Sequence, residues 1–257
     1  MKFFKDKQWW RERATLVKHW FGAHKEVWLL AFLPVIVLSY MFINRYVTPI
    51  WTVITPLDDK IPFSEYWIIP YCIWYVVYPG SLLFFLFKDK KAYFNLCWMM
   101  IGGLLIATVF YLAVPNHVPF EEVGPDNDGF FAQWANLIRG GATRNAAFPS
   151  EHCVVAIAID FAVQRSDFFK KRYVWRAVSF LFMLSVCAAT VFLKQHSVLD
   201  MFGSFIVVMV LNMISIYYGW YKEDRAARKA GSAMPTIAET VPVEAEAAAA
   251  IETVVEE

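Results

Sequence analysis

The stretch YFNLCWMMIGGLLIATVFYLAV, residues 93–114, is long and apolar enough to cross a membrane as a helix. Such a helix needs about 20 mostly apolar residues. The whole chain shares this character, because 58% of its 257 residues are hydrophobic, only 18% are charged, and the mean hydropathy is +0.42. A soluble domain carries roughly 25% charged residues. The composition therefore excludes disorder over most of the chain and favours an integral membrane protein.

We predict an all-α membrane protein with six transmembrane helices, because six stretches are continuously apolar, whereas barrel strands alternate over about 10 residues. The predicted spans are 27–47, 66–87, 93–114, 149–163, 173–193 and 196–218. The fourth is short and contains Asp160, for which we expect a hydrogen bond to a neighbouring helix, a functional carboxylate being the alternative. Pro79-Gly80 is expected to break the second span. Gly203 and Gly102-Gly103 are expected to permit close helix contact.

The basic residues indicate the orientation of the spans. Most of the 24 Lys and Arg residues fall in segments 1–26, 88–91, 165–176 and 222–229. Because Lys and Arg concentrate on the cytoplasmic side, both termini are predicted to be cytoplasmic in a multi-pass plasma-membrane protein. The loops 48–65 and 115–149 then face outward. That side keeps five cations: Arg45, Lys60, Arg139, Arg144 and Lys194.

Composition divides the chain into three parts. Residues 1–26 mix tryptophans with basic residues, which predicts an amphipathic helix at the cytoplasmic interface. Residues 27–220 form the six-helix membrane domain. Residues 221–257 are predicted to be a disordered acidic cytoplasmic tail. Within the outer loop, the apolar residues of segment 130–139 share one helical face, so a helix at the outer interface is expected there.

Two histidine motifs open predicted spans on the outward side. His196 and Asp200 are four residues apart, which puts them on one helical face, so the carboxylate can fix the imidazole tautomer and leave the other ring nitrogen free. Ser150 precedes a helix start, where free backbone N–H groups bind anions, and His152 follows in the first turn. Together the two motifs suit phosphoryl transfer.

Three of the scarce outward cations, Arg139, Arg144 and Lys194, lie near these motifs in sequence, as an anion site requires. The simpler alternative stays open: boundary histidines often only face headgroups, and Ser-capped helices are common. The four cysteines, Cys72, Cys97, Cys153 and Cys187, fit no metal or redox spacing and are interpreted as buried apolar side chains.

At these motifs a resemblance becomes visible. AAFPSEH, residues 146–152, and TVFLKQHSVLD, residues 190–200, resemble the last two motifs of the type-2 phosphatidic acid phosphatase superfamily, most of all bacterial members near its inositol phosphorylceramide synthase-like branch. The resemblance implies that His196 attacks phosphorus and forms a phosphohistidine, and that Asp200 orients His196. It also implies that His152 protonates the leaving alkoxide and then activates water, that Ser150 helps to hold the phosphoryl oxygens, and that no metal or cofactor is required.

The sequence departs from that family at its cations. The family's first motif is a Lys followed seven residues later by Arg-Pro, and residues 115–120 read PNHVPF instead. The Arg that usually precedes the last histidine by six residues is Thr190 here. We interpret Lys194, Arg144 and Arg139 as substitutes for the missing cations.

The leading functional prediction is a membrane phosphatase that hydrolyses a lipid phosphate or diphosphate at the outer face. A lipid headgroup phosphotransferase with the same site is the alternative. A non-catalytic scaffold or a transporter is the second alternative, although no inverted repeat is visible. The expected partners are the lipid bilayer and a membrane lipid phosphate substrate, with no nucleic acid; the sequence identifies no protein partner.

Overall fold

A computed structural model describes residues 15, 19, 21–22, 24–120, 128–141 and 145–229. Most of the expected interfacial segment, Arg144 and the tail after residue 229 lie outside these residues. The chain divides into two compact units, Met1–Asn212 and Met213–Glu257, whose boundary falls inside the last helix. The first unit carries all the features discussed below.

The fold is helical, as expected. The elements in the first half are η2 (Lys25–Ala31), α2 (Phe32–Tyr46), β1 (Trp51–Thr52), η3 (Asp58–Lys60), η4 (Glu65–Trp67), α3 (Ile68–Lys88) and α4 (Lys90–Ala113). Those in the second half are β2 (Asn116–His117), α5 (Phe130–Gly141), α6 (Glu151–Arg165), α7 (Tyr173–Phe192) and α8 (Val198–Lys229). Each of the six predicted spans and the predicted outer helix therefore forms a helix at the expected place.

Five helices in the described part of the chain are long and apolar enough to cross a membrane: Lys25–Tyr46, Glu65–Lys88, Lys90–Ala113, Tyr173–Phe192 and Val198–Gly219. The protein is thus a multi-pass membrane protein. The expected fourth span corresponds to α6, which has only 15 residues and is not among the five. Side chains Cys153 to Asp160 of α6 are all buried, so this helix is surrounded by protein rather than by lipid.

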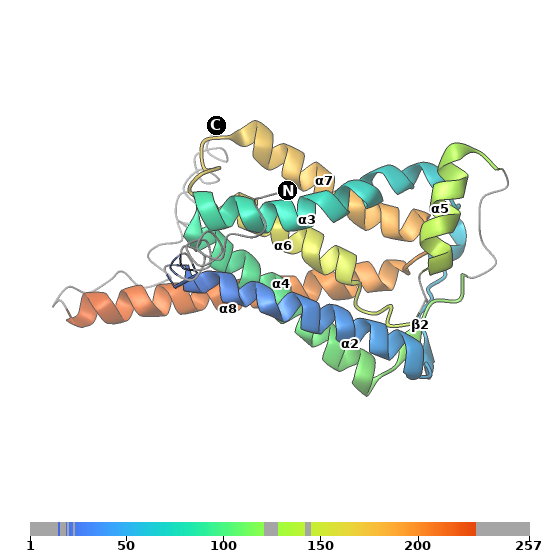
Figure 1. Cartoon of the computed structure of the whole chain (residues 1–257), viewed down its shortest axis with the longest axis horizontal. Helices are drawn as coiled ribbons and strands as arrows, with labels where there is room; N and C mark the ends of the chain where they lie inside the picture. The colour runs from blue at the N-terminus through green and yellow to red at the C-terminus, as the bar shows by residue number, and fades with distance from the viewer. Residues whose placement is uncertain are drawn as a thin grey trace, which may run out of the picture. The chain divides into compact units, whose positions relative to one another are not determined.

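Helix α6 lies between α4 and α7, and Figure 1 shows it running among the longer helices. Its approach to α4 requires a glycine, because a Cβ at Gly103 would lie 2.6 Å from Val154 Cγ1. Asp160 Oδ1 accepts hydrogen bonds from Ser179 Oγ of α7 at 2.8 Å and from Gln164 Nε2 at 3.0 Å. Asp160 therefore makes the expected interhelix contact.

The expected break at Pro79-Gly80 is absent, because α3 is one continuous helix of 21 residues. Pro70 stands in its first turn, where backbone N–H groups have no intrahelical partner and none is lost. Near Pro79, Ser81 Oγ donates to the Tyr78 carbonyl at 2.8 Å, within the turn that contains the proline.

The segments that follow α2 and α4 are joined by a short parallel strand pair. Strand β1 pairs with β2 in the register Trp51 to Asn116 and Thr52 to His117. Thr52 Oγ1 and His117 Nε2 are 2.9 Å apart. This pairing connects the loop before α3 to the loop after α4. It also holds the His117 side chain in a contact with Thr52, away from the other histidines.

Candidate active site

His196 lies in a tight turn between α7 and α8. Backbone N–H groups of Gln195 and His196 both donate to the Thr190 carbonyl, at 2.9 and 3.1 Å. Lys194 has φ of 55°, in the left-handed region, which lets the chain reverse within a few residues. Thr190 stands at the position where the similar family carries an Arg. In this protein, its backbone carbonyl oxygen holds the turn by accepting both hydrogen bonds.

Two acceptors hold the His196 ring. Its Nδ1 lies 3.0 Å from the Ala147 carbonyl oxygen and 3.1 Å from Asp200 Oδ2. A carbonyl only accepts hydrogen bonds, so Nδ1 carries the proton in this arrangement. The lone pair of a neutral His196 is consequently on Nε2. Asp200 is fully buried, and its Oδ2 also accepts from the Ser197 backbone N–H at 2.9 Å.

The surroundings of His196 also shift the pKa of its imidazole. Burial lowers the pKa of His196, but the hydrogen bond and the negative charge of Asp200 outweigh burial and raise the pKa above its usual 6.5. An imidazolium beside a carboxylate is stabilised by charge, so Asp200 supports a positively charged state of the ring.

Asp58, from the distant loop before α3, braces this turn. Its Oδ2 accepts from Ser197 Oγ at 2.6 Å and its Oδ1 accepts from the Val198 backbone N–H at 2.8 Å. Its carbonyl oxygen accepts from Lys194 Nζ at 2.6 Å. Burial raises the pKa of Asp58, but the hydrogen bonds from Ser197, Val198 and Thr55 outweigh it and hold that pKa below the ordinary value.

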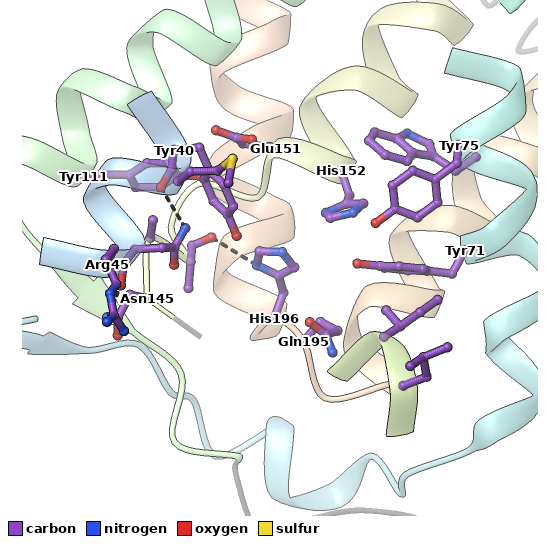
Figure 2. A pocket seen from close by; sticks show the side chains of 17 residues that line it. Tyr40, Arg45, Tyr71, Tyr75, Tyr111, Asn145, Glu151, His152, Gln195 and His196 are labelled. Atoms are coloured by element: carbon purple, nitrogen blue, oxygen red, sulfur yellow. Dashed lines mark hydrogen bonds between the residues drawn. The ribbon is translucent and has the colours of Figure 1, made fainter. Parts of the chain in front are cut away.

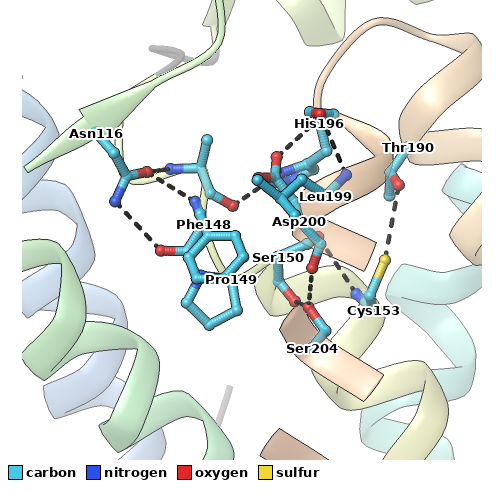
Figure 3. A network of polar contacts seen from close by, with 12 residues as sticks. Asn116, Phe148, Pro149, Ser150, Cys153, Thr190, His196, Leu199, Asp200 and Ser204 are labelled. Carbon is cyan, nitrogen blue, oxygen red and sulfur yellow. Dashed lines mark hydrogen bonds and ion pairs between the residues drawn. The ribbon is translucent and has the colours of Figure 1, made fainter. Parts of the chain in front are cut away.

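Asn116 holds the segment opposite His196. Its Oδ1 accepts from the backbone N–H groups of Ala147 and Phe148, at 2.9 and 2.7 Å, and its Nδ2 donates to the Phe148 carbonyl at 3.2 Å. Figure 3 shows Asn116 on one side of this segment and His196 on the other. Asn116 therefore fixes the Ala147 carbonyl that orients His196.

His152, in the first turn of α6, faces His196 with a ring-centroid distance of 5.9 Å. Its ring lies 4.7 Å from that of Tyr71 and 4.5 Å from that of Trp74, both on α3. Both ring nitrogens are buried and have no hydrogen-bond partner among the described residues. Packing thus positions the ring while leaving its nitrogens available to a ligand.

Both histidines line one cavity of about 590 Å³, a volume typical of small-molecule sites. Figure 2 shows His196 and His152 facing its interior, with Tyr71 and Tyr75 behind His152. Of the described residues that line it, Arg45 is the one with a permanent positive charge. Gln195 also lines the cavity, and its buried Nε2 has no partner in the described part of the chain. Arg45 and Gln195 are therefore donors suited to an anion.

The structure separates the other predicted site residues from this cavity. Ser150 is buried, and its Oγ accepts from the Cys153 N–H as the N-cap of α6. Lys194 donates to Asp58, and its ammonium lies 5.0 Å from the centre of the Phe120 ring. Arg139 donates to the Phe120 carbonyl at 3.1 Å. These three side chains do not line the cavity, and Arg144 lies outside the described residues.

Sequence reasoning did not select Arg45, Asp58, Asn116, Tyr71 or Trp74. The sequence identifies Arg45 only as one of the five cations predicted to face outward. Because Arg45 is far in sequence from both histidine motifs, nothing in the sequence predicts that it lines their cavity. Asp58 and Asn116 stand in loops without any motif. Tyr71 and Trp74 are aromatic residues in an apolar span, where nothing distinguishes them from lipid-facing neighbours.

Fold and site together define a multi-pass membrane protein with a buried histidine pair in a cavity. A family model of the PAP2 superfamily matches residues 56–214, which include both histidine motifs. The match covers more than half of the chain, so the protein belongs to the PAP2 superfamily, and this membership indicates phosphatase-type activity. No curated protein and no solved structure matches the chain. Within the described residues, no cluster of three or more His, Cys, Asp or Glu side chains could hold a metal ion.

Proposed function

We propose that the protein is a membrane phosphatase that hydrolyses a lipid phosphate or diphosphate through a phosphohistidine on His196. The observation that carries this proposal is the pair of contacts from His196 Nδ1 to Ala147 and Asp200, since they leave Nε2 as the free nucleophile beside His152. Phosphoryl transfer depends mainly on such positioning and on charge neutralisation.

In the first step, His196 Nε2 forms a bond to phosphorus and the bond from phosphorus to the leaving alkoxide oxygen breaks. Burial lowers the pKa of His152 to about 3, and the negative charge of the bound phosphate raises it again, so that His152 carries a proton when the substrate is bound. His152 donates this proton to the leaving oxygen, so the alcohol leaves neutral. Arg45 and Gln195 neutralise and bind the phosphoryl oxygens from the cavity wall. Asp200 stabilises the positive charge that develops on His196.

In the second step, water replaces the alcohol. His152, now neutral, removes a proton from the water as its oxygen bonds to phosphorus, and the bond from Nε2 to phosphorus breaks. Inorganic phosphate leaves and His152 regains its proton, so the cycle closes without another reactant. If a lipid hydroxyl takes the place of water, the same residues perform headgroup transfer.

The cavity is formed by the ends of α2, α3, α4 and α6 nearest to loops 48–65 and 115–149. These loops carry few basic residues, whereas most Lys and Arg residues lie at the other helix ends. By the positive-inside rule, the cavity opens to the extracytoplasmic side of the plasma membrane and both termini are cytoplasmic. A lipid headgroup of the outer leaflet is then the natural substrate.

The test is the release of inorganic phosphate by purified full-length protein from a panel of lipid phosphates and diphosphates. We expect turnover that His196→Ala and His152→Ala abolish and that His117→Ala, a histidine outside the cavity, preserves. Acid-labile labelling of His196 with ³²P should precede phosphate release. Turnover that survives His196→Ala contradicts the mechanism. Transfer of label to an added alcohol without phosphate release identifies the phosphotransferase instead.

A further inference from the structure

Glu151 places a carboxylate in the wall of a cavity that is proposed to bind phosphate. It lines the same cavity as the histidines, and its Oε1 is buried without a hydrogen-bond partner among the described residues. It is the one carboxylate in the described lining. A buried carboxylate is costly unless it is paired, and burial raises the pKa of Glu151 to about 7. A cation that binds beside Glu151 would therefore hold the side chain in its charged form.

Glu151 and His152 are adjacent on α6 but point to different walls. Figure 2 shows Glu151 beside Tyr40 and Tyr111, whereas His152 lies beside Tyr71 and Tyr75. The cavity therefore has two neighbouring parts: a phosphate part between the histidines, and a part defined by Glu151, Tyr40 and Tyr111, which we call the acidic subsite.

The acidic subsite combines a carboxylate with aromatic rings. Tyr40 and Tyr111 pack edge to face with centroids 6.5 Å apart. Aromatic faces attract ammonium groups, and a carboxylate adds a charge-assisted hydrogen bond. A phosphate has the wrong charge for this subsite, since Glu151 would repel it. The chemistry of the subsite thus matches a cation that is attached to the phosphate.

We propose that the acidic subsite binds a substrate ammonium group that lies a few bonds from the phosphate, as in a 2-aminoethyl phosphate unit. The inference rests on the proposed function, which places the phosphate between His152 and His196. Two classes of lipid carry this unit: a long-chain amine with a phosphate monoester, and a zwitterionic phosphodiester headgroup. In either class the ammonium pairs with Glu151 and offsets its repulsion of the phosphate.

The first experiment measures binding without chemistry. The purified full-length protein is titrated with O-phosphoethanolamine and with ethyl phosphate, which lacks the ammonium. We expect O-phosphoethanolamine to bind about tenfold more tightly, because charged hydrogen bonds contribute of this order. Glu151→Gln should remove the preference, and Asp59→Asn, an exposed outward acid, should keep it. Equal binding by the wild type, or a preference that survives Glu151→Gln, overturns the proposal.

The second experiment distinguishes the two lipid classes by turnover. Sphingosine 1-phosphate is compared with ceramide 1-phosphate, whose amine is acylated and neutral, and phosphatidylethanolamine is compared with its N-acetyl derivative, a phosphodiester that lacks the ammonium. Faster turnover of one amine-bearing lipid, lost in Glu151→Gln, supports the proposal and identifies the class. Faster turnover of both amine-free lipids overturns it.

A control separates this inference from the proposed function. In His196→Ala the nucleophile is absent, but the acidic subsite is intact, so the binding preference for O-phosphoethanolamine should persist. If His196→Ala retains turnover, the phosphohistidine mechanism fails while the binding result still decides the role of Glu151. If only Glu151→Gln removes the preference for O-phosphoethanolamine, the result supports the acidic subsite, whether the protein is a phosphatase or a phosphotransferase.

Discussion

The Asp58 carboxylate accepts a 2.6 Å hydrogen bond from Ser197 Oγ across 139 positions of sequence. Its second oxygen accepts from the first backbone N–H of α8, at Val198. Asp58 therefore acts as an N-terminal cap of α8 supplied by another loop, and a negative charge at that end also suits the helix dipole. His196 lies between Lys194 and Ser197, two of the three residues in this turn that donate to Asp58.

Removal of the Asp58 carboxylate should therefore loosen the nucleophile. For Asp58→Ala we expect a fall in kcat of about 10- to 100-fold, since small misplacement of a catalytic group is costly. The unfolding temperature should fall as well, because donors on Thr55 and on the buried residues Ser197 and Val198 lose their acceptor. Asp59→Ala, at the exposed neighbouring position, is the matched control and should behave as the wild type. Equal kcat for both variants contradicts the positioning role.

The raised pKa of His196 predicts an acidic limit to activity. The attacking species is the neutral imidazole, and Asp200 keeps the ring protonated to a higher pH than the usual 6.5. Activity should therefore fall as the pH drops through the raised pKa, so the acidic limb of the kcat/KM profile lies above pH 6.5. Asp200→Asn should move this limb to lower pH and reduce kcat by roughly 10²- to 10⁴-fold. An acidic limb that Asp200→Asn leaves in place excludes His196 as its origin.

Periodicity and apolar length were sufficient to predict the helices, because each span is an uninterrupted apolar run in a chain with few charges. These features could not show that α6 is surrounded by protein, since such an apolar helix has the same composition as one surrounded by lipid. The break at Pro79 was wrongly predicted, because α3 continues through the proline over 21 residues. A proline in a membrane-spanning helix is tolerated where neighbouring groups satisfy the backbone groups that it frees.

The histidine pair could be found from sequence because each member lies in a local motif that opens a helix. The surrounding groups could not. Lys194 is near His196 in sequence, but its buried ammonium is used by the Asp58 carbonyl. Arg45 is 151 positions from His196, and only the packing of α2 against α4 brings it to the cavity. Spacing along a chain identifies partners on one element and says little about side chains from different loops.

This arrangement predicts different effects for the removal of Arg45 and of Lys194. Arg45→Ala should reduce kcat/KM by about 10- to 100-fold, because it removes the charged donor that lines the cavity. Its thermal stability should stay near that of the wild type, since Arg45 is exposed. Lys194→Ala should instead lower the unfolding temperature, because it removes the 2.6 Å hydrogen bond to the buried Asp58 carbonyl and leaves that oxygen only the weaker bond from the Ile61 backbone N–H at 3.3 Å.

Lys60→Ala is the matched control for both variants, because Lys60 is an exposed outward cation that does not line the cavity. Activity and unfolding temperature are measured on the same purified samples. If Arg45→Ala retains full kcat/KM while Lys194→Ala loses it without loss of stability, Lys194 rather than Arg45 acts on the phosphate.

The close approach of Gly203 to the Phe148 ring leads to a prediction for Gly203→Ala. A Cβ at Gly203 would lie 2.4 Å from Phe148 Cε2, and the Phe148 ring is held by edge contacts with Trp51 and Phe110 at centroid distances of 5.5 and 5.1 Å. Gly203→Ala must therefore displace the Phe148 ring, and we expect the shift to reach the adjacent Ala147 carbonyl that contacts His196 Nδ1.

We expect Gly203→Ala to lower kcat more than tenfold and to destabilise the fold by about 1–3 kcal/mol, the usual cost of overpacking. Gly80→Ala is the control, because nothing lies within 4 Å of a Cβ there and alanine favours a helix. If Gly203→Ala destabilises the protein but leaves the pH profile and kcat unchanged, Ala147 does not orient the nucleophile. Loss of kcat with an acidic limb shifted away from that of the wild type is the result that the contact between Ala147 and His196 requires.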